Sequence, residues 1–117
     1  MHKIERQTNL KLQIELLREI IKDSDRVHIT MHMMTRFFER GIEYDDIIAS
    51  INSGEIIEQY PDDYPYPSCL ISGYSSTEQV LHTVCGTSGE DVWIISAYYP
   101  DNNRWSDDFK IRKEKKS

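Results

Sequence analysis

The first periodic pattern of apolar positions lies in residues 10–22 and has the spacing of an amphipathic helix. Its positions, three or four residues apart, are Leu10, Ile14, Leu17 and Ile21, and Leu16 and Ile20 widen the stripe. Thr8 or Asn9 is a suitable N-cap, and Asp23-Ser24-Asp25 ends the pattern. We expect this helix, within an N-terminal segment of residues 1–25, to dock on the same domain. A homodimer through its stripe is the alternative.

A second helix is predicted to follow Thr30, a favourable N-cap, and to end at Gly41, a residue that readily adopts left-handed backbone. At ~100° per residue the helix has two distinct sides. The apolar side carries Met31, Met33, Met34, Phe37 and Phe38. The polar side carries His32, Thr35, Arg36, Glu39 and Arg40. This clean division makes the segment an amphipathic helix with one charged face.

A third helix is expected from about Tyr44 to Asn52, and after Gly54 the pattern changes to strands and turns. The predicted strands are Glu55–Tyr60, Cys69–Tyr74, Gln79–Gly86 and Val92–Tyr99. Short turns between consecutive strands imply antiparallel neighbours. We therefore predict one α+β domain over residues 1–117, with N-terminal helices packed on an antiparallel sheet of about four strands. Trp105 and Phe109 should fold back on it, and residues 114–117 should form a frayed basic tail.

The last two strands can be aligned through the turn that joins them. If the turn centres on Ser88-Gly89-Glu90, His82 lies near Ser96, Val80 near Tyr98 and Val84 near Ile94. Because side chains alternate between the two faces of a sheet, His82, Ser96 and Tyr98 would then share one face. A slip of one residue in the register would separate them.

Charge is distributed unevenly along the chain, whose net charge is −6. Between Gly41 and Asn103 there is no Lys or Arg, so the positive charge lies in the first forty residues and in a tail from Arg104 to Lys116. The middle of the chain therefore cannot bind a polyanion by bulk electrostatics. A nucleic acid would have to be contacted by Arg36, Arg40 and the tail, and a basic partner protein is the alternative.

The two cysteines, Cys69 and Cys85, lie in apolar strand patterns and are expected to be reduced and buried. His82 and Cys85 are three residues apart on one predicted strand, so they point to opposite faces and cannot share an ion. We expect no metal and no cofactor. No apolar segment is long enough to cross a bilayer, and the N-terminus leads into a charged helix, so we expect no membrane association and a cytoplasmic location.

The order of short motifs resembles that of a bacterial family known only as a domain of unknown function. The opening motif is Thr30-x-His32-x-x-x-Arg36-x-x-x-Arg40-Gly41-Ile42, and later ones are Gly54-Glu55-Ile56-Ile57-Glu58 and Leu81-His82. A common subgroup is matched by Pro67-Ser68-Cys69-Leu70, Tyr99-Pro100-Asp101, Trp105 and Asp108-Phe109-Lys110. The resemblance covers residues 28–113 and omits the first helix.

This resemblance implies a fold like that of the RelE and MqsR ribonuclease toxins, in which helices pack on a curved antiparallel sheet. It also implies a partner, because relatives of the subgroup resemble genomic neighbours of small antitoxins with a Cys-rich zinc finger of the MqsA kind. The chain would then be the toxin-like component of a type II toxin–antitoxin system, an endoribonuclease that cleaves RNA by acid–base chemistry.

RelE-like toxins hold the RNA phosphate with Arg or Lys while other side chains transfer protons. The candidates here are His32 and His82 for proton transfer, Arg36 and Arg40 for the phosphate, and Tyr98 as a second donor. Imidazole titrates near neutral pH, and guanidinium binds phosphate through two parallel hydrogen bonds.

Each candidate also has a purely structural interpretation. Arg36 and Glu39 form an i, i+3 pair, Arg40 suits the helix C-terminus, and His82 resembles a core histidine with its hydrogen bonds satisfied. The second hypothesis is therefore a catalytically inert protein-binding module of the same fold. The Tyr-Pro-rich segment around Tyr64 and Tyr66 is a separate candidate site, for a small-molecule ligand.

Overall fold

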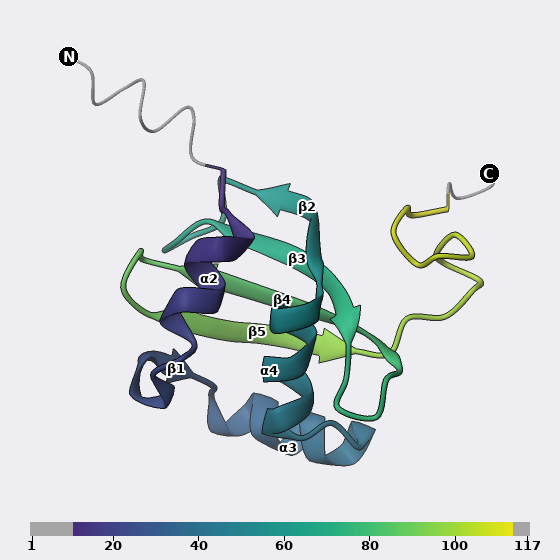
Figure 1. Ribbon diagram of the computed structural model, residues 1–117, viewed down its shortest axis with the longest axis horizontal. Coiled ribbons are helices and arrows are strands. Elements are labelled where there is room, and N and C mark those ends of the chain that lie inside the picture. Colours follow the sequence, from purple (N-terminus) through teal and green to yellow (C-terminus); the bar gives the residue numbers. More distant parts are fainter. Residues whose placement is uncertain (1–10, 114–117) are drawn as a thin grey trace.

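The computed structural model describes residues 11–113. The predicted tail of residues 114–117 lies outside this range. The first helix is shorter than the predicted 10–22: residues 11–13 are not helical, and the helix begins at Ile14 after Gln13, so neither Thr8 nor Asn9 caps it. The helices are α2 (Ile14–Ile20), α3 (Met31–Arg40) and α4 (Tyr44–Ser53), with a short 3-10 turn η1 (Ser24–Arg26). The strands are β1 (Val27–His28), β2 (Glu55–Tyr60), β3 (Ser68–Tyr74), β4 (Val80–Thr87) and β5 (Val92–Tyr98), in the spatial order β1-β5-β4-β3-β2 (Figure 1).

The predicted α+β class and the four antiparallel strands are confirmed, but the sheet has a fifth strand and is mixed. The added strand, β1, pairs in parallel with β5 through Val27 and Val92 and through His28 and Trp93. A strand of two residues is too short to show an alternating pattern, which is why periodicity could not predict it. The sheet is curled but does not close into a barrel.

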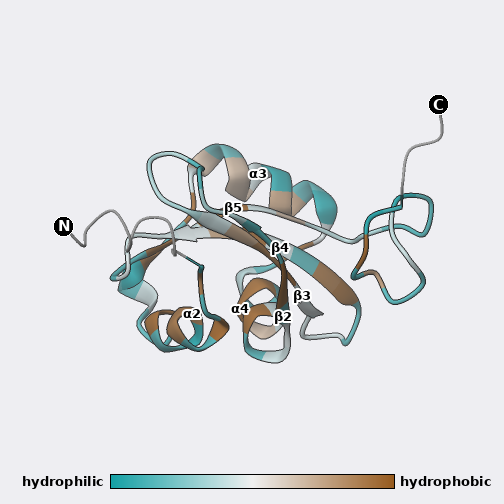
Figure 2. Ribbon diagram, turned by 90° about the horizontal axis from the view of Figure 1, so that it is seen from above, coloured by the Kyte–Doolittle hydropathy of each residue, from teal (hydrophilic) through white to brown (hydrophobic). Residues whose placement is uncertain are grey.

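Helices α2 and α4 cover one face of the sheet (Figure 2). Leu17 and Ile20 of α2 and Ile47 and Ile51 of α4 are buried in one core with Ile71, Leu81 and Cys85 of the strands. Burial of each such side chain stabilises the fold by roughly 1.5–3 kcal/mol. The expected docking of the first helix on its own domain is confirmed for residues 14–20.

Helix α3 begins and ends as its capping residues predict. The Thr30 hydroxyl accepts a hydrogen bond from the amide of Met33, and Gly41 has a left-handed φ of 72°. The helix lies along β5, on the other side of the sheet from α2 and α4 (Figure 2). Of its apolar side only Phe37 is fully buried, whereas Met31, Met34 and Phe38 are 78%, 53% and 85% exposed. The helix therefore docks along one margin of its apolar side and leaves a stripe of three side chains in solvent.

The two cysteines are free and buried, as expected, and they face each other directly across β3 and β4. A hydrogen bond with Cys69, together with burial, raises the pKa of the Cys85 thiol well above its ordinary value. Because the thiolate is the reactive form, this pair is suited to packing.

None of the helices in residues 11–113 is long and apolar enough to span a membrane.

Candidate active site

The register of β4 and β5 differs from the prediction but keeps His82 and Tyr98 on one face. His82 pairs with Tyr98 rather than Ser96, Val84 pairs with Ser96, and Cys85 pairs with Ile94. The connecting loop spans four residues, 88–91, and a bulge between Val84 and Cys85 adds one more residue. The longer loop and the bulge each shift the pairing of β4 with β5 by one residue. A total shift of two residues leaves every side chain on the face that was predicted for it. The predicted neighbours were therefore wrong, but the predicted common face of His82 and Tyr98 is confirmed.

That face is the one opposite α4. Thr83 bonds to Ser50 of α4 at 2.8 Å, so its neighbour His82 points to the other side of the sheet. There the His82 ring is fully buried. Its Nδ1 lies 3.3 Å from the Tyr98 hydroxyl, and its Nε2 lies 2.8 Å from the carbonyl oxygen of Phe109.

These contacts fix the tautomer of His82. A carbonyl oxygen only accepts, so Nε2 carries the hydrogen and donates it to Phe109. Burial lowers the pKa of His82 below its ordinary value of 6.5, which favours the neutral ring. Nδ1 then has a lone pair and accepts the hydroxyl hydrogen of Tyr98. The result is a base held by a third group and aimed at a hydroxyl, the arrangement used to activate hydroxyl groups in catalysis.

The segment of residues 104–113 covers His82. It folds into a loop closed by hydrogen bonds from the Lys113 amide to the Arg104 carbonyl, 2.9 Å, and from the Ser106 amide to the Ile111 carbonyl, 2.8 Å. The buried Trp105 ring meets the His82 ring edge-on, 4.5 Å between centroids. The predicted folding back of Trp105 is confirmed.

Phe109 has a φ of 62°. Left-handed backbone costs a bulky residue about 1–2 kcal/mol. The hydrogen bond from His82 to the Phe109 carbonyl helps to offset this cost, so the segment is held in one particular conformation over the ring.

An ion pair fastens the same segment to β2. Arg112 donates to both carboxylate oxygens of Glu58, at 3.0 and 3.1 Å, and its guanidinium lies 4.7 Å from the centre of the Trp105 ring. Tyr60 donates a further short hydrogen bond to Glu58. Burial opposes ionisation of Glu58, but the bonds from Arg112 and Tyr60 prevail and lower its pKa. Burial and the Glu58 carboxylate raise the pKa of Tyr60 to about 12.

A cavity of about 400 Å³ opens beside this cluster. The residues lining it include Tyr98, Arg104 and Arg112, with Asp101 as an acidic neighbour. Burial raises the pKa of Tyr98, so its hydroxyl stays protonated near neutral pH. Within residues 11–113 the Arg104 guanidinium has no ion pair, whereas that of Arg112 is held by Glu58. The cavity therefore offers a phenol backed by an imidazole together with two cations.

The polar side chains of α3 make no described hydrogen bond to His82 or Tyr98. Arg40 donates to the carbonyl of Ala97 at 2.7 Å, on the edge of β5. His32 and Arg36 are exposed, and in the described part of the chain no hydrogen bond joins either of them to His82 or Tyr98. Of the predicted site residues, the structure thus brings His82 and Tyr98 into direct contact. Arg40 contacts Ala97, the residue before Tyr98 in the chain.

Arg40 and Arg36 should differ in their effect on stability. Replacing Arg40 with methionine removes the donor to an edge carbonyl, and we expect the free energy of unfolding to fall by about 1 kcal/mol. Arg36→Met changes another exposed arginine of the same helix and should stay within about 0.5 kcal/mol of wild type. Urea unfolding of both variants measures the difference. Equal values for the two would contradict a structural role for the Arg40 contact.

Sequence reasoning missed four members of the cluster: Glu58, Tyr60, Arg104 and Arg112. The sequence predicts that the tail from Arg104 to Lys116 would contact a nucleic acid, but it does not place Arg104 and Arg112 beside Tyr98. Alternation along β2 could have placed Glu58 and Tyr60 on one face, since they are two residues apart. Nothing in the periodicity of residues 104–113 indicates that their loop returns to that face.

Within residues 11–113 no three His, Cys, Asp or Glu side chains are grouped so that they could hold a metal ion. The residues present in the cluster, an imidazole hydrogen-bonded to a phenol beside two guanidinium groups, offer proton transfer and binding of an anion.

Comparison with known proteins places the chain in a family. It belongs to the family described as Domain of unknown function (DUF4258), whose model matches residues 29–99. The match runs from the residue before Thr30 to the one after Tyr98, so it includes α3 and the His82–Tyr98 pair but not residues 104–113. No curated protein and no solved structure matches the chain. Membership of an uncharacterised domain family is thus confirmed, and likeness to RelE and MqsR stays a prediction.

Proposed function

We propose that this protein is the toxin-like component of a type II toxin–antitoxin system and that it cleaves RNA at the cavity beside Tyr98. One observation carries the proposal: the Tyr98 hydroxyl, hydrogen-bonded to the buried His82, lines the same cavity as Arg104 and Arg112. A cavity of about 400 Å³ lies within the range of small-ligand sites, and a nucleotide fits such a space.

The chemistry follows from the tautomer of His82. The 2′-oxygen of the RNA forms a bond to the adjacent phosphorus while the bond from phosphorus to the 5′-oxygen breaks. The 2′-hydroxyl proton passes to Tyr98, whose own proton passes to Nδ1 of His82. The departing 5′-oxygen takes a proton from water, and His82 returns its proton through Tyr98 to the hydroxide that remains. Arg104 and Arg112 stabilise the charge on the phosphate oxygens.

The charge distribution supports this location for RNA. Arg104, Lys110, Arg112 and Lys113 all belong to the segment that covers His82, whereas residues 41–103 contain no Lys or Arg. Phosphate contacts by cationic side chains provide most of the affinity of proteins for nucleic acids. Arg36, Arg40 and His32 of α3 remain proposed as further contacts to the RNA.

The proposed partner, implied by the family resemblance, is a small antitoxin-like protein with a zinc finger. Association with such a protein would keep the ribonuclease inactive. A homodimer through α2 stays a separate prediction, which sedimentation of the full chain would test.

A second candidate function is a catalytically inert protein-binding module. Two observations favour it: both nitrogens of His82 are already hydrogen-bonded inside the protein, and α3 exposes Met31, Met34 and Phe38 to solvent. Exposed apolar stripes on helices commonly mark sites of protein association. In this alternative the His82–Tyr98 pair only holds residues 104–113 in place.

Cleavage of RNA by the purified full chain distinguishes the two candidates. We expect single-stranded RNA to be cut in the presence of EDTA, leaving 2′,3′-cyclic phosphate and 5′-hydroxyl ends, and induced expression to arrest growth and degrade cellular RNA. Intact RNA in both settings would refute the ribonuclease proposal and leave the binding module.

Arg104→Gln tests the cavity itself. The change removes one cation from the cavity without touching the ion pair of Arg112, so cleavage should fall at least roughly tenfold while folding is retained. Arg26→Gln is the matched control, because Arg26 is an exposed arginine in η1 with a long 3.7 Å pair to Asp23. If the two variants cleave RNA equally well, the phosphate is bound elsewhere.

A further inference from the structure

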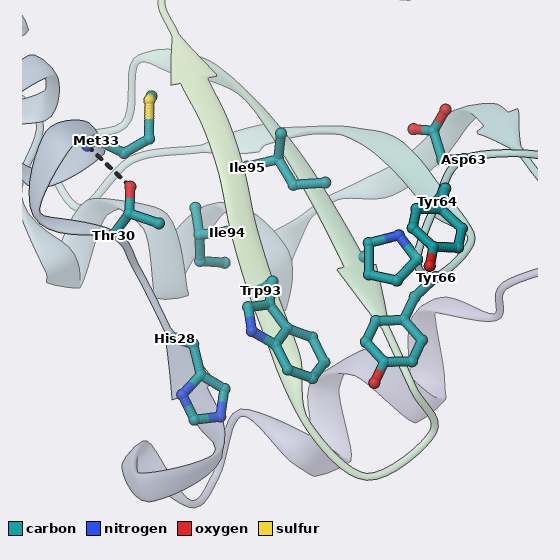
Figure 3. Close-up of a pocket in the computed structure, with 11 residues that line it drawn as sticks. His28, Thr30, Met33, Asp63, Tyr64, Tyr66, Trp93, Ile94 and Ile95 are labelled. Carbon is teal, nitrogen blue, oxygen red and sulfur yellow. Dashed lines mark hydrogen bonds between the residues drawn. The ribbon is translucent and has the colours of Figure 1, made fainter.

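A second concave site lies at the other end of β5 from Tyr98. It is a groove of about 620 Å³ between the start of α3 and the turn that carries Tyr64 and Tyr66 (Figure 3). Thr30 and Met33 border it on the α3 side, and Ile95 of β5 lies between the two walls. Among residues 11–113, the cavity beside Tyr98 and this groove have no lining residue in common.

Aromatic stacking holds one wall of the groove in place. The Trp93 ring stacks on His28 of β1, 5.1 Å between centroids, and on Tyr66, 4.8 Å between centroids. The interplanar angles are 28° and 22°. Three segments far apart in the sequence are thereby tied together, so the groove is preformed. A preformed site spares a ligand the cost of ordering it.

The groove presents apolar surface to solvent. Tyr64 is 94% exposed, Ile95 is 45% exposed and Tyr66 is 38% exposed. A single exposed apolar side chain is ordinary, but several around one concave site indicate association with another molecule.

Acidic side chains flank the groove on two sides. Asp62 and Asp63 lie in the turn before Tyr64, and Glu90 and Asp91 lie in the loop that leads into β5. No Lys or Arg is among the described residues that line it, and the one cationic candidate, His28, is paired with Asp91 at 3.1 Å. A polyanion is repelled here, whereas a basic molecule is attracted.

We propose that this groove binds a peptide segment of a partner protein in which bulky apolar side chains are flanked by Lys or Arg. The apolar side chains lie over Ile95 between Met33 and the tyrosines, and the basic side chains approach the two acidic loops. This binding site does not depend on RNA cleavage at Tyr98. A nucleic acid fits the groove poorly, because its phosphates would meet the aspartates.

Selection from a library of random 12-residue peptides displayed on phage, with the full chain as bait, tests the proposal. The selected peptides, made synthetically, should combine aromatic or large aliphatic residues with Lys or Arg, and their Kd is measured by fluorescence anisotropy. Ile95→Asp and Tyr64→Ala, both changes of exposed side chains, should each weaken binding at least tenfold. The double variant Asp62→Lys, Glu90→Lys should weaken binding several-fold at low salt and less at high salt.

Tyr74→Ala is the matched control for Tyr64→Ala, because Tyr74 is 53% exposed at the end of β3 and is not among the described residues that line the groove; its Kd should equal that of wild type. Peptides that are acidic, that bind both groove variants as tightly as wild type, or that are not enriched at all would overturn the proposal. So would a homodimer of the full chain in sedimentation that Ile95→Asp dissociates, because a second copy would then be the occupant. RNA cleavage by Ile95→Asp should match that of wild type, which separates this site from the proposed ribonuclease site.

Discussion

Phenylalanine at position 98 is expected to lower the rate of RNA cleavage by roughly 10²–10⁴-fold, the usual contribution of a positioned acid or base. The change removes the hydroxyl that carries the proton from the RNA to His82. It keeps the aromatic ring, whose centroid lies 5.3 Å from the centroid of the His82 ring. Nδ1 of His82 loses its partner, which costs stability about 1–3 kcal/mol, so the fold is weakened but retained. Single-turnover cleavage of a defined RNA measures the effect on the chemical step.

Tyr44→Phe is the control, because Tyr44 is a partly exposed tyrosine at the start of α4, the helix on the other face of the sheet. It should cleave RNA at the wild-type rate. Cleavage at the wild-type rate by Tyr98→Phe would show that the hydroxyl carries no proton, even if the chain is a ribonuclease.

The pH dependence gives a second readout of the same relay. The relay needs neutral His82, whose folded pKa is lowered below 6.5 by burial. The cleavage rate of the wild type should therefore be constant above pH 6.5 and should fall as the pH drops through that lowered pKa. His82→Gln should lose most of the cleavage activity, and the activity that remains should no longer fall as the pH is lowered.

The helices were predictable because their ends are set by local chemistry. Thr30 and Gly41 fix both ends of α3 through a hydroxyl acceptor and a left-handed φ, and these depend little on the rest of the fold. Which margin of α3 would face the sheet was not predictable. Its apolar side spans about half the helix, and only contact with β5 selects Phe37 for burial and leaves Phe38 in solvent.

The strands were also predictable in extent, but their register was not. Alternation places His82 and Tyr98 on one face whether the pairing shifts by zero or two residues. A four-residue loop and a bulge decide the actual partner, and neither has a clear signal in the sequence.

The candidate site was half predictable for a related reason. His82 and Tyr98 come from a periodic part of the chain, whereas Arg104 and Arg112 come from a loop whose course is set by tertiary contacts such as the stacking on Trp105. The helix face of His32, Arg36 and Arg40 stood out because its charges were regularly spaced. Regular spacing predicts a helix face, not its distance from a residue on a neighbouring strand.

Alanine at position 73 should destabilise the fold more than any other change considered above. Gly73 of β3 lies beneath the end of α4, where an added Cβ would lie 2.0 Å from the backbone oxygen of Ser50 and 2.8 Å from its carbonyl carbon. Backbone atoms cannot move aside as the end of a flexible side chain can. Helix α4 is also held in place by the 2.8 Å hydrogen bond between the hydroxyl groups of Ser50 and Thr83. We expect the free energy of unfolding to fall by about 3 kcal/mol or more, a large part of the 5–15 kcal/mol typical of a domain.

Gly41→Ala is the informative comparison, because no atom of the described residues lies within 4 Å of a Cβ added at Gly41, whose φ is 72°. Gly41→Ala should lower the free energy of unfolding only by the cost of a left-handed backbone at alanine, about 1–2 kcal/mol. Urea unfolding followed by circular dichroism gives both values, and a Gly73→Ala chain that fails to fold while Gly41→Ala folds satisfies the same expectation. Equal losses would mean that α4 shifts easily on β3. The contact of α4 with β3 would then not be rigid, and the sheet would no longer be a fixed support for the His82–Tyr98 pair on its opposite face.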